Sequence, residues 1–211
     1  MGTVLAMTKR KAAAPMIENR KVMPQRPKNA DVRTREYLLP AEVDKLVATA
    51  AKLGRHGARD ALLILMAYRH GLRATELVSL QWSQVDLKGA RLTVRRLKRG
   101  NPAVHPLSTT ELRALGRLRK EHPDDAYLFV SERGTPMSAD NLRKLVTRAG
   151  EEAALGFPVH PHMLRHACGY KLANDGHDTR LIQDYLGHIN IQHTVNYTRL
   201  RSDQFNQLWK D

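Results

Sequence analysis

Helix start and stop signals follow one another along most of this chain, and they limit the folds that it can adopt. Proline is preorganised for the first turn of a helix, and glycine commonly ends one. Pro40 opens a segment with apolar residues at helical spacing that ends at Gly54, and a second segment runs from about Gly57 to Arg69 and ends at Gly71. Further helices are expected at about 72–80, 109–121, 138–154, 161–174, 178–186 and 191–197. The pattern predicts a mostly helical protein.

One part of the chain alternates between apolar and polar residues instead of following helical spacing. Residues 91–97 predict a strand, 98–102 a turn, and 103–107 a return strand, so that Lys98 lies at the tip of a β-hairpin. A further short strand is expected at 127–130. The predicted fold class is therefore α+β, mostly helical with a small antiparallel sheet.

The two ends of the chain differ from this central part. Residues 1–36 interleave basic residues with prolines and show no hydrophobic periodicity, which predicts a flexible basic arm before a domain at 37–211. The arm either follows DNA or is a disordered leader. At the other end, Ser202 begins a predicted helix at about 202–209, with Phe205, Leu208 and Trp209 on one stripe. We expect this stripe to dock on its own domain or on a neighbouring protomer.

The charge balance favours a polyanionic partner. The chain has 35 Lys and Arg against 21 Asp and Glu, a formal net charge of +14, which favours nucleic acid. A basic membrane-surface protein is the rival class, but no amphipathic basic helix with a Trp or Phe face is visible. The single cysteine, Cys168, excludes a disulfide framework and a cysteine-based zinc site. The sequence shows neither a transmembrane run nor a secretory signal, so we expect a cytoplasmic protein.

One helix start gathers groups that suit a phosphate. Residues three and four apart share a helix face, so His162, Arg165 and His166 project together from the helix that Pro161 opens. The helix N-terminus adds partial positive charge and free N–H groups. The two histidines also have zinc-helix spacing, but Met163 stands where a metalloprotease needs its glutamate, and Arg165 would repel a dication. We therefore expect no metal.

Other candidates lie apart from this helix. They are Arg73 with Glu76 one turn on, Lys98 among Arg95, Arg96 and Arg99, His188 after a helix end, and Tyr197. Taken singly, each has an ordinary structural explanation, such as a helix salt bridge, a solubilising turn, a helix cap or packing. Residue type alone leaves these alternatives open.

Taken together, the motifs match a known pattern. Gly71-Leu72-Arg73-Ala74-Thr75-Glu76-Leu77, the hairpin lysine, His162 to His166, Leu186-Gly187-His188 and Tyr197 occur in this order. Their order and approximate spacing resemble the tyrosine recombinase (phage integrase) family, over about residues 37–209. Residues 160–166 and 178–188 are similar to the short fimbrial phase-variation invertases.

The resemblance implies a role for each matching residue. Tyr197 would be the nucleophile that forms a 3′-phosphotyrosyl intermediate, and Arg73 and Arg165 would hold the non-bridging oxygens. Lys98 would protonate the leaving 5′ oxygen, and His162 would be the acid/base partner of the nucleophile. The resemblance further implies phosphate hydrogen bonds from His166 and His188, a supporting role for Glu76 beside Arg73, and DNA contacts from Arg95, Arg96 and Arg99. Because the phosphodiester energy is conserved, no cofactor is needed.

The resemblance also implies partners. They are double-stranded DNA and further copies of the chain, as a tetramer of two dimers on DNA. Only the basic arm precedes Tyr37 here, whereas most family members have a core-binding domain, so an accessory DNA-bending protein would be a further partner and binding should be salt-sensitive. The competing hypotheses are a DNA-binding regulator that no longer recombines and a type IB topoisomerase. The sequence does not say whether the outcome is inversion, integration, excision or resolution.

Overall fold

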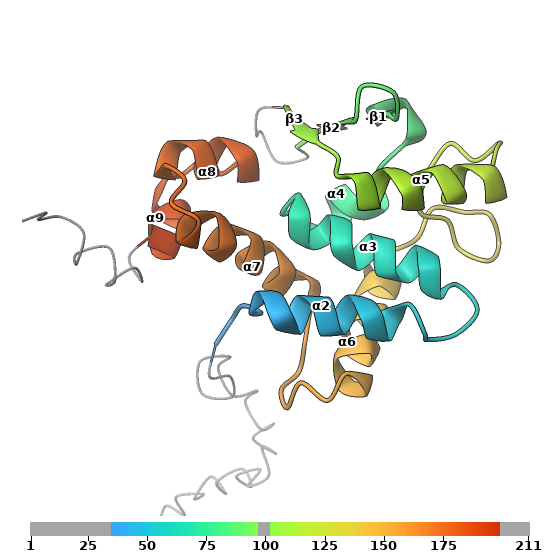
Figure 1. Cartoon of the computed structure of the whole chain (residues 1–211), viewed down its shortest axis with the longest axis horizontal. Coiled ribbons are helices and arrows are strands. Elements are labelled where there is room, and N and C mark those ends of the chain that lie inside the picture. The colour runs from blue at the N-terminus through green and yellow to red at the C-terminus, as the bar shows by residue number, and fades with distance from the viewer. Residues whose placement is uncertain (1–34, 97–101, 199–211) are drawn as a thin grey trace, which may run out of the picture. The chain divides into compact units, whose positions relative to one another are not determined.

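The computed structural model describes residues 35–96 and 102–198 of the chain (Figure 1). Most of the expected basic arm, the hairpin tip with Lys98 and Arg99, and the expected C-terminal helix at 202–209 lie outside the described residues. Arg35, which we expected in the arm, forms an ion pair with Glu42, and its guanidinium lies 5.3 Å from the centre of the Phe157 ring. No described helix is long and apolar enough to cross a membrane.

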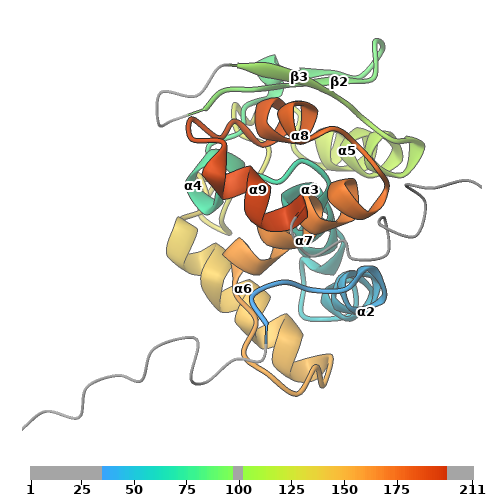
Figure 2. The ribbon, with the colours of Figure 1, turned by 90° about the vertical axis from the view of Figure 1, so that its left-hand side faces the viewer.

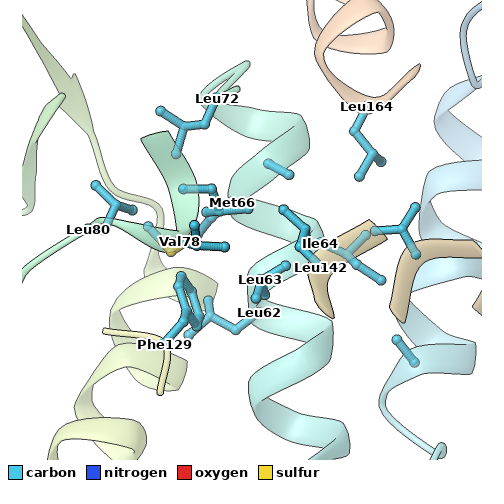
Figure 3. Packing of buried hydrophobic residues seen from close by; sticks show 14 of the residues in the cluster. Leu62, Leu63, Ile64, Met66, Leu72, Val78, Leu80, Phe129, Leu142 and Leu164 are labelled. Carbon is cyan, nitrogen blue, oxygen red and sulfur yellow. The ribbon is translucent and has the colours of Figure 1, made fainter. Parts of the chain in front are cut away.

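Helix α3 is the centre of the core. It spans Gly57–Arg69 and is surrounded by α2 (Pro40–Ala50), α5 (Thr109–Glu121) and α7 (Pro161–Asn174), as Figure 1 shows. A helix that is apolar on several faces has to be buried. Accordingly, the central residues of α3 are buried and pack against side chains from neighbouring elements (Figure 3). These α3 residues include Leu62, Leu63, Ile64 and Met66.

The remaining helical elements include one 3-10 turn that the sequence did not indicate. They are α4 (Ala74–Val78), the 3-10 turn η1 (Trp82–Gln84), α6 (Ala139–Glu152), α8 (Thr179–Leu186) and α9 (Gln192–Thr198). Ser138 caps α6 by accepting from the Asn141 amide at 3.0 Å, and Asp178 caps α8 by accepting from the Arg180 amide at 2.7 Å. Helix α8 ends at Gly187, whose φ of 64° favours glycine. The mostly helical prediction is confirmed.

The sheet is small and antiparallel. Its strands are β1 (Val85–Asp86), β2 (Arg91–Val94) and β3 (Ala103–Pro106), in the order β1-β2-β3, with Leu92 opposite His105. The expected strand at 127–130 is wrong, because this stretch forms only isolated bridges at its two ends. Its apolar residues are buried, and its backbone hydrogen bonds run to Leu80 on one side and to Met137 on the other instead of along one partner strand. An apolar run of this length does not distinguish the two outcomes.

The C-terminal helices bring distant parts of the sequence together. In Figure 2, α8 and α9 lie in front of α7, and the β2–β3 hairpin passes above α8. Direct contacts join α7 to both α8 and α9, and α8 to β3. The motif residues of α7, α8 and α9 therefore meet at one side of the core.

Candidate active site

Arg165 is the buried centre of the site. Only 2% of this residue is exposed. Its guanidinium donates one hydrogen bond to the Gly71 carbonyl and another, from Nη2 at 2.7 Å, to the Leu186 carbonyl. One side chain of α7 thus ties the start of the α4 motif to the end of α8. This arrangement explains why the sequence motifs beginning at Gly71 and at Leu186 lie at the same place.

Arg73 and Glu76 form a pair at the start of α4. Arg73 Nη1 lies 2.8 Å from Glu76 Oε1, and the Arg73 backbone amide donates to Oε2 at 3.0 Å. Burial by itself would raise the pKa of Glu76, but the hydrogen bond from this amide and the charges of Arg96 and Arg73 hold it below the usual value. The carboxylate therefore stays ionised and fixes the Arg73 side chain, the contact that the sequence suggested.

Arg96 lies elsewhere than we expected. The side chain was expected to contact DNA, but its exposed fraction is 0%, and its Nη1 lies 2.9 Å from Glu76 Oε2. Its Nη2 donates to the Tyr185 carbonyl. The paired carboxylate draws this guanidinium inward, whereas the neighbouring Arg95 remains exposed. Alternation along the strand puts Arg96 on the same side as the buried Leu92 and Val94, but it does not identify Glu76 as the partner.

Tyr197 is buried against α7. The residue is 3% exposed, and its hydroxyl lies 3.0 Å from His166 Nδ1. The Tyr170 ring stands edge-on to the Tyr197 ring, with 5.0 Å between their centres. A Cβ atom at Gly169 would lie 2.5 Å from the Tyr197 ring, so this position accommodates the ring only as glycine. Sequence reasoning missed Gly169 and Tyr170, although glycine inside a helix is an available signal of close packing.

The histidine that contacts Tyr197 is His166, whereas His162 was expected to be its partner. Helix α9 packs against the second and third turns of α7, where His166 and Gly169 lie, and His162 is one turn before His166. The two imidazoles still form a pair, with ring centres 4.4 Å apart in an edge-to-face arrangement. His162 is the exposed member of the pair.

His188 is a second histidine close to Tyr197. Its ring is roughly parallel to that of Tyr197, with centres 6.1 Å apart, and its Nδ1 is 2.9 Å from Thr194 Oγ1. The site therefore places two imidazoles next to the phenol. Thr194 was not identified from the sequence; it orients the His188 ring from one turn before Tyr197.

Burial keeps these groups neutral in the free protein. It raises the pKa of Tyr197 to about 12, although the charge of Arg165 opposes this shift. Burial and then the neighbouring His162 lower the pKa of His166 to about 4. Burial and then the Arg165 charge lower the pKa of His188 to about 3. Near pH 7 the site therefore holds a phenol and two uncharged imidazoles.

The permanent charges of the cluster do not balance. Arg73, Arg96 and Arg165 contribute three positive charges, whereas Glu76 is the carboxylate that pairs with the first two. Burial lowers the pKa of Arg165 to about 10, and repulsion by the Arg73 charge is the next largest cause of this shift. Among the described residues, no three His, Cys, Asp or Glu side chains gather in a way that would hold a metal ion. A buried positive surplus of this kind suits an anionic group such as a phosphodiester.

Comparison with known proteins points in the same direction. The model of the phage integrase family matches residues 36–204. The type 1 fimbriae regulatory protein FimE of Escherichia coli K12 is 46% identical over 183 residues, covering 83% of this chain and 91% of that protein. FimB from the same strain is 42% identical over 185 residues, covering 85% of this chain and 92% of that protein.

Solved structures share the fold. The crystal structure of XerA recombinase superposes with a TM-score of 0.71 at 27% identity, over 81% of this chain and 62% of that one. XerH site-specific recombinase bound to its difH substrate, before cleavage, gives a TM-score of 0.67 at 23% identity, over 84% and 53% of the two chains. The present chain thus spans between half and two thirds of the length of these two structures.

Proposed function

The chain belongs to the phage integrase family and is a tyrosine-type site-specific recombinase, and on this premise we propose that Tyr197 attacks a DNA phosphodiester at a defined site. The bond from the Tyr197 oxygen to phosphorus forms as the bond from phosphorus to the 5′ oxygen breaks, giving a 3′-phosphotyrosyl enzyme and a free 5′-hydroxyl. Attack by a 5′-hydroxyl of the partner duplex reverses the step and rejoins the strands. The bond energy is conserved throughout, so no cofactor takes part.

Arg73 and Arg165 bind the non-bridging oxygens in this proposal. A guanidinium donates two parallel hydrogen bonds and keeps its charge, which stabilises the charge that builds up at the phosphorus. The single observation that carries the proposal is the juxtaposition of the Tyr197 hydroxyl with His166 beside this unbalanced arginine cluster. His188, whose ring centre lies 6.1 Å from that of Tyr197, donates to the same phosphate.

Proton transfer uses groups on both sides of the phosphorus. The Tyr197 proton passes to the imidazole pair, by direct contact with His166 and with the exposed His162 as the acid/base group toward solvent. Lys98, which we expect at the hairpin tip, donates the proton that the leaving 5′ oxygen takes up. Because a neutral phenol is a poor nucleophile, phosphate binding precedes attack, and the phenol proton leaves as the bond to phosphorus forms.

The proposed substrate is double-stranded DNA. XerH was solved bound to its difH substrate, and a lambda integrase dimer was solved bound to a core site. For this chain we propose a tetramer of two dimers on DNA, in which the segment at about 202–209 docks on a neighbouring protomer. Arg95, which is exposed, and Arg99, which we expect in the hairpin tip, contact DNA phosphates. An accessory DNA-bending protein adds further contacts to the DNA.

A covalent-adduct experiment tests the proposal and identifies the target site at the same time. Nicked duplexes of random sequence are incubated with the full chain, and protein–DNA adducts are isolated under denaturing conditions and sequenced. We expect adducts that share one sequence and disappear in Tyr197→Phe. DNA binding without any covalent adduct would favour a DNA-binding regulator. In a second assay, relaxation of supercoiled plasmid DNA that lacks a shared sequence would favour a topoisomerase. A duplex with the recovered sequence, the selected duplex, then serves as substrate.

A further inference from the structure

Arg96 is the buried arginine of the cluster that the proposed mechanism does not use. It follows β2, at the base of the hairpin, and its side chain reaches two other elements. Nη1 lies 2.9 Å from Glu76 Oε2 on α4, and Nη2 donates to the Tyr185 carbonyl on α8. A Cβ atom at Gly187 would lie 2.6 Å from Arg96 Nε, so the end of α8 closes directly over this side chain.

Glu76 is shared between two guanidinium groups. Its Oε1 accepts from Arg73 at 2.8 Å, while Oε2 accepts from Arg96 at 2.9 Å and from the Arg73 amide at 3.0 Å. A carboxylate paired with Arg73 alone would cancel its charge. Because Arg96 takes up half of the carboxylate, the three groups together keep one positive charge. Arg73 is therefore held in place without being neutralised.

The burial of Arg96 is costly for stability alone. Its charge is removed from water, burial lowers its pKa against the opposing Glu76 charge, and its Nε has no hydrogen-bond partner among the described residues. Replacing a buried ion pair by apolar side chains is often neutral or stabilising. A buried arginine at this position therefore calls for a role other than stability.

We propose that Arg96 is a positioning residue for Arg73: by sharing Glu76, it fixes the Arg73 guanidinium and preserves its positive charge for the scissile phosphate. The inference rests on the proposed function, in which Arg73 binds that phosphate. It differs from the sequence expectation, because Arg96 acts through a carboxylate inside the protein and does not contact DNA itself.

The test compares cleavage of two versions of the selected duplex. One has the ordinary scissile phosphate, and the other has a methylphosphonate there, which carries no charge and so depends less on an arginine. With Arg96→Met we expect cleavage of the phosphate to fall about 100-fold, the range observed when one stabilising donor is removed. On the methylphosphonate, cleavage should stay within about tenfold of the parent chain, and DNA affinity should change little, because Arg96 does not touch DNA.

Arg59→Met is the matched control. Arg59 also pairs with a carboxylate, Asp60, at 2.8 Å, and donates to a backbone carbonyl, that of Val130, at 2.8 Å. It lies near the start of α3, the opposite end of that helix from Gly71. It therefore reports the general cost of losing a part-buried arginine. Arg96→Lys keeps the positive charge, but an ammonium group cannot bridge two acceptors as the planar guanidinium does. This variant should therefore recover part of the cleavage rate that Arg96→Met loses.

Several results would overturn the inference. One is that Arg96→Met cleaves the phosphate substrate as fast as Arg59→Met does. Another is that Arg96→Met loses the same fraction of its cleavage rate on the phosphate and on the methylphosphonate. A third is that a 5′-bridging phosphorothiolate, and not the methylphosphonate, restores the rate, which would assign Arg96 to the leaving-group side. If Arg96→Met does not fold, the same two-substrate comparison with Arg96→Lys decides. Failure of the parent chain to form any adduct would reject the proposed function, whereas an adduct indifferent to Arg96 rejects only this inference.

Discussion

At the scale of single residues, the environment of a side chain decides its chemistry more than its type does. The chain has adjacent arginines at 95 and 96, yet Arg95 is exposed and Arg96 is buried on a carboxylate. Similarly, His162 and His166 lie one turn apart, but only His166 contacts the Tyr197 hydroxyl. An ion pair or a hydrogen bond formed between elements distant in sequence separates residues that look equivalent in the sequence.

Lys98 gives a prediction at this scale. If it protonates the leaving 5′ oxygen, Lys98→Ala should slow cleavage of the selected duplex by about 100-fold or more. A 5′-bridging phosphorothiolate has a leaving group that needs no proton, so this substrate should restore most of the rate. Single-turnover cleavage on the two substrates measures the effect. Lys120→Ala, in α5, is the control substitution, and a loss of equal size on both substrates would remove Lys98 from the acid role.

At the scale of elements, the packing of α9 on α7 sets the position of the nucleophile. Gly169 lies in the middle of α7, where glycine normally weakens a helix by about 1 kcal/mol relative to alanine. Here its missing side chain makes room for the Tyr197 ring. The helix gives up some intrinsic stability at Gly169 so that Tyr197 can lie beside His166.

Gly169→Ala tests this packing. The added methyl group would lie 2.5 Å from the Tyr197 ring, so the ring has to shift and lose its alignment with His166. We expect cleavage to fall by about 10- to 100-fold, because small displacements of reacting groups have large effects on rate. Gly116→Ala is the matched control in α5, since a Cβ there meets nothing within 4 Å. Equal cleavage by both variants would contradict this role of Gly169.

At the scale of the whole domain, several histidines are held uncharged by burial. Besides His166 and His188, His105 on β3 is 0% exposed, and burial followed by the His70 and Arg96 charges lowers its pKa to about 3. Its Nδ1 lies 3.3 Å from His70 Nδ1, and its ring stacks on Tyr185. His70 in turn contacts the buried Glu111 at 2.9 Å. This cluster joins the hairpin to α3, α5 and α8.

These depressed pKa values predict a loss of stability in mild acid. An unfolded histidine titrates near pH 6.5, so between about pH 6.5 and 3 the unfolded chain binds more protons than the folded one. The free energy of unfolding should therefore fall as the pH decreases below about 6.5, by up to about 1.4 kcal/mol per pH unit for His105.

Urea unfolding at pH 7 and pH 5 measures this loss. His105→Phe keeps the stacking on Tyr185 but removes the titrating group, so the difference in unfolding free energy between the two pH values should become smaller. His177→Gln, at an exposed position, is the control. An unchanged pH dependence in His105→Phe would contradict the prediction.

The sequence by itself determined the local features of this protein. Helical spacing, prolines, caps and glycines specified the helices, because these signals act between residues close together in the chain. The ordered motifs from Gly71 to Tyr197 indicated the recombinase family, which the comparisons confirmed. The strand expected at 127–130 did not form because the segments on its two sides pair with it only at single bridges, which a local apolar run does not reveal.

Only the tertiary structure decided which of these residues meet. The pairing of Arg96 with Glu76 joins positions 20 residues apart, and the contact between His166 and Tyr197 joins positions 31 apart. Periodicity shows which residues share a face of one element, but it does not show which other element covers that face. The burial that keeps Tyr197 a phenol, and the sharing of Glu76 by two arginines, depend on that packing.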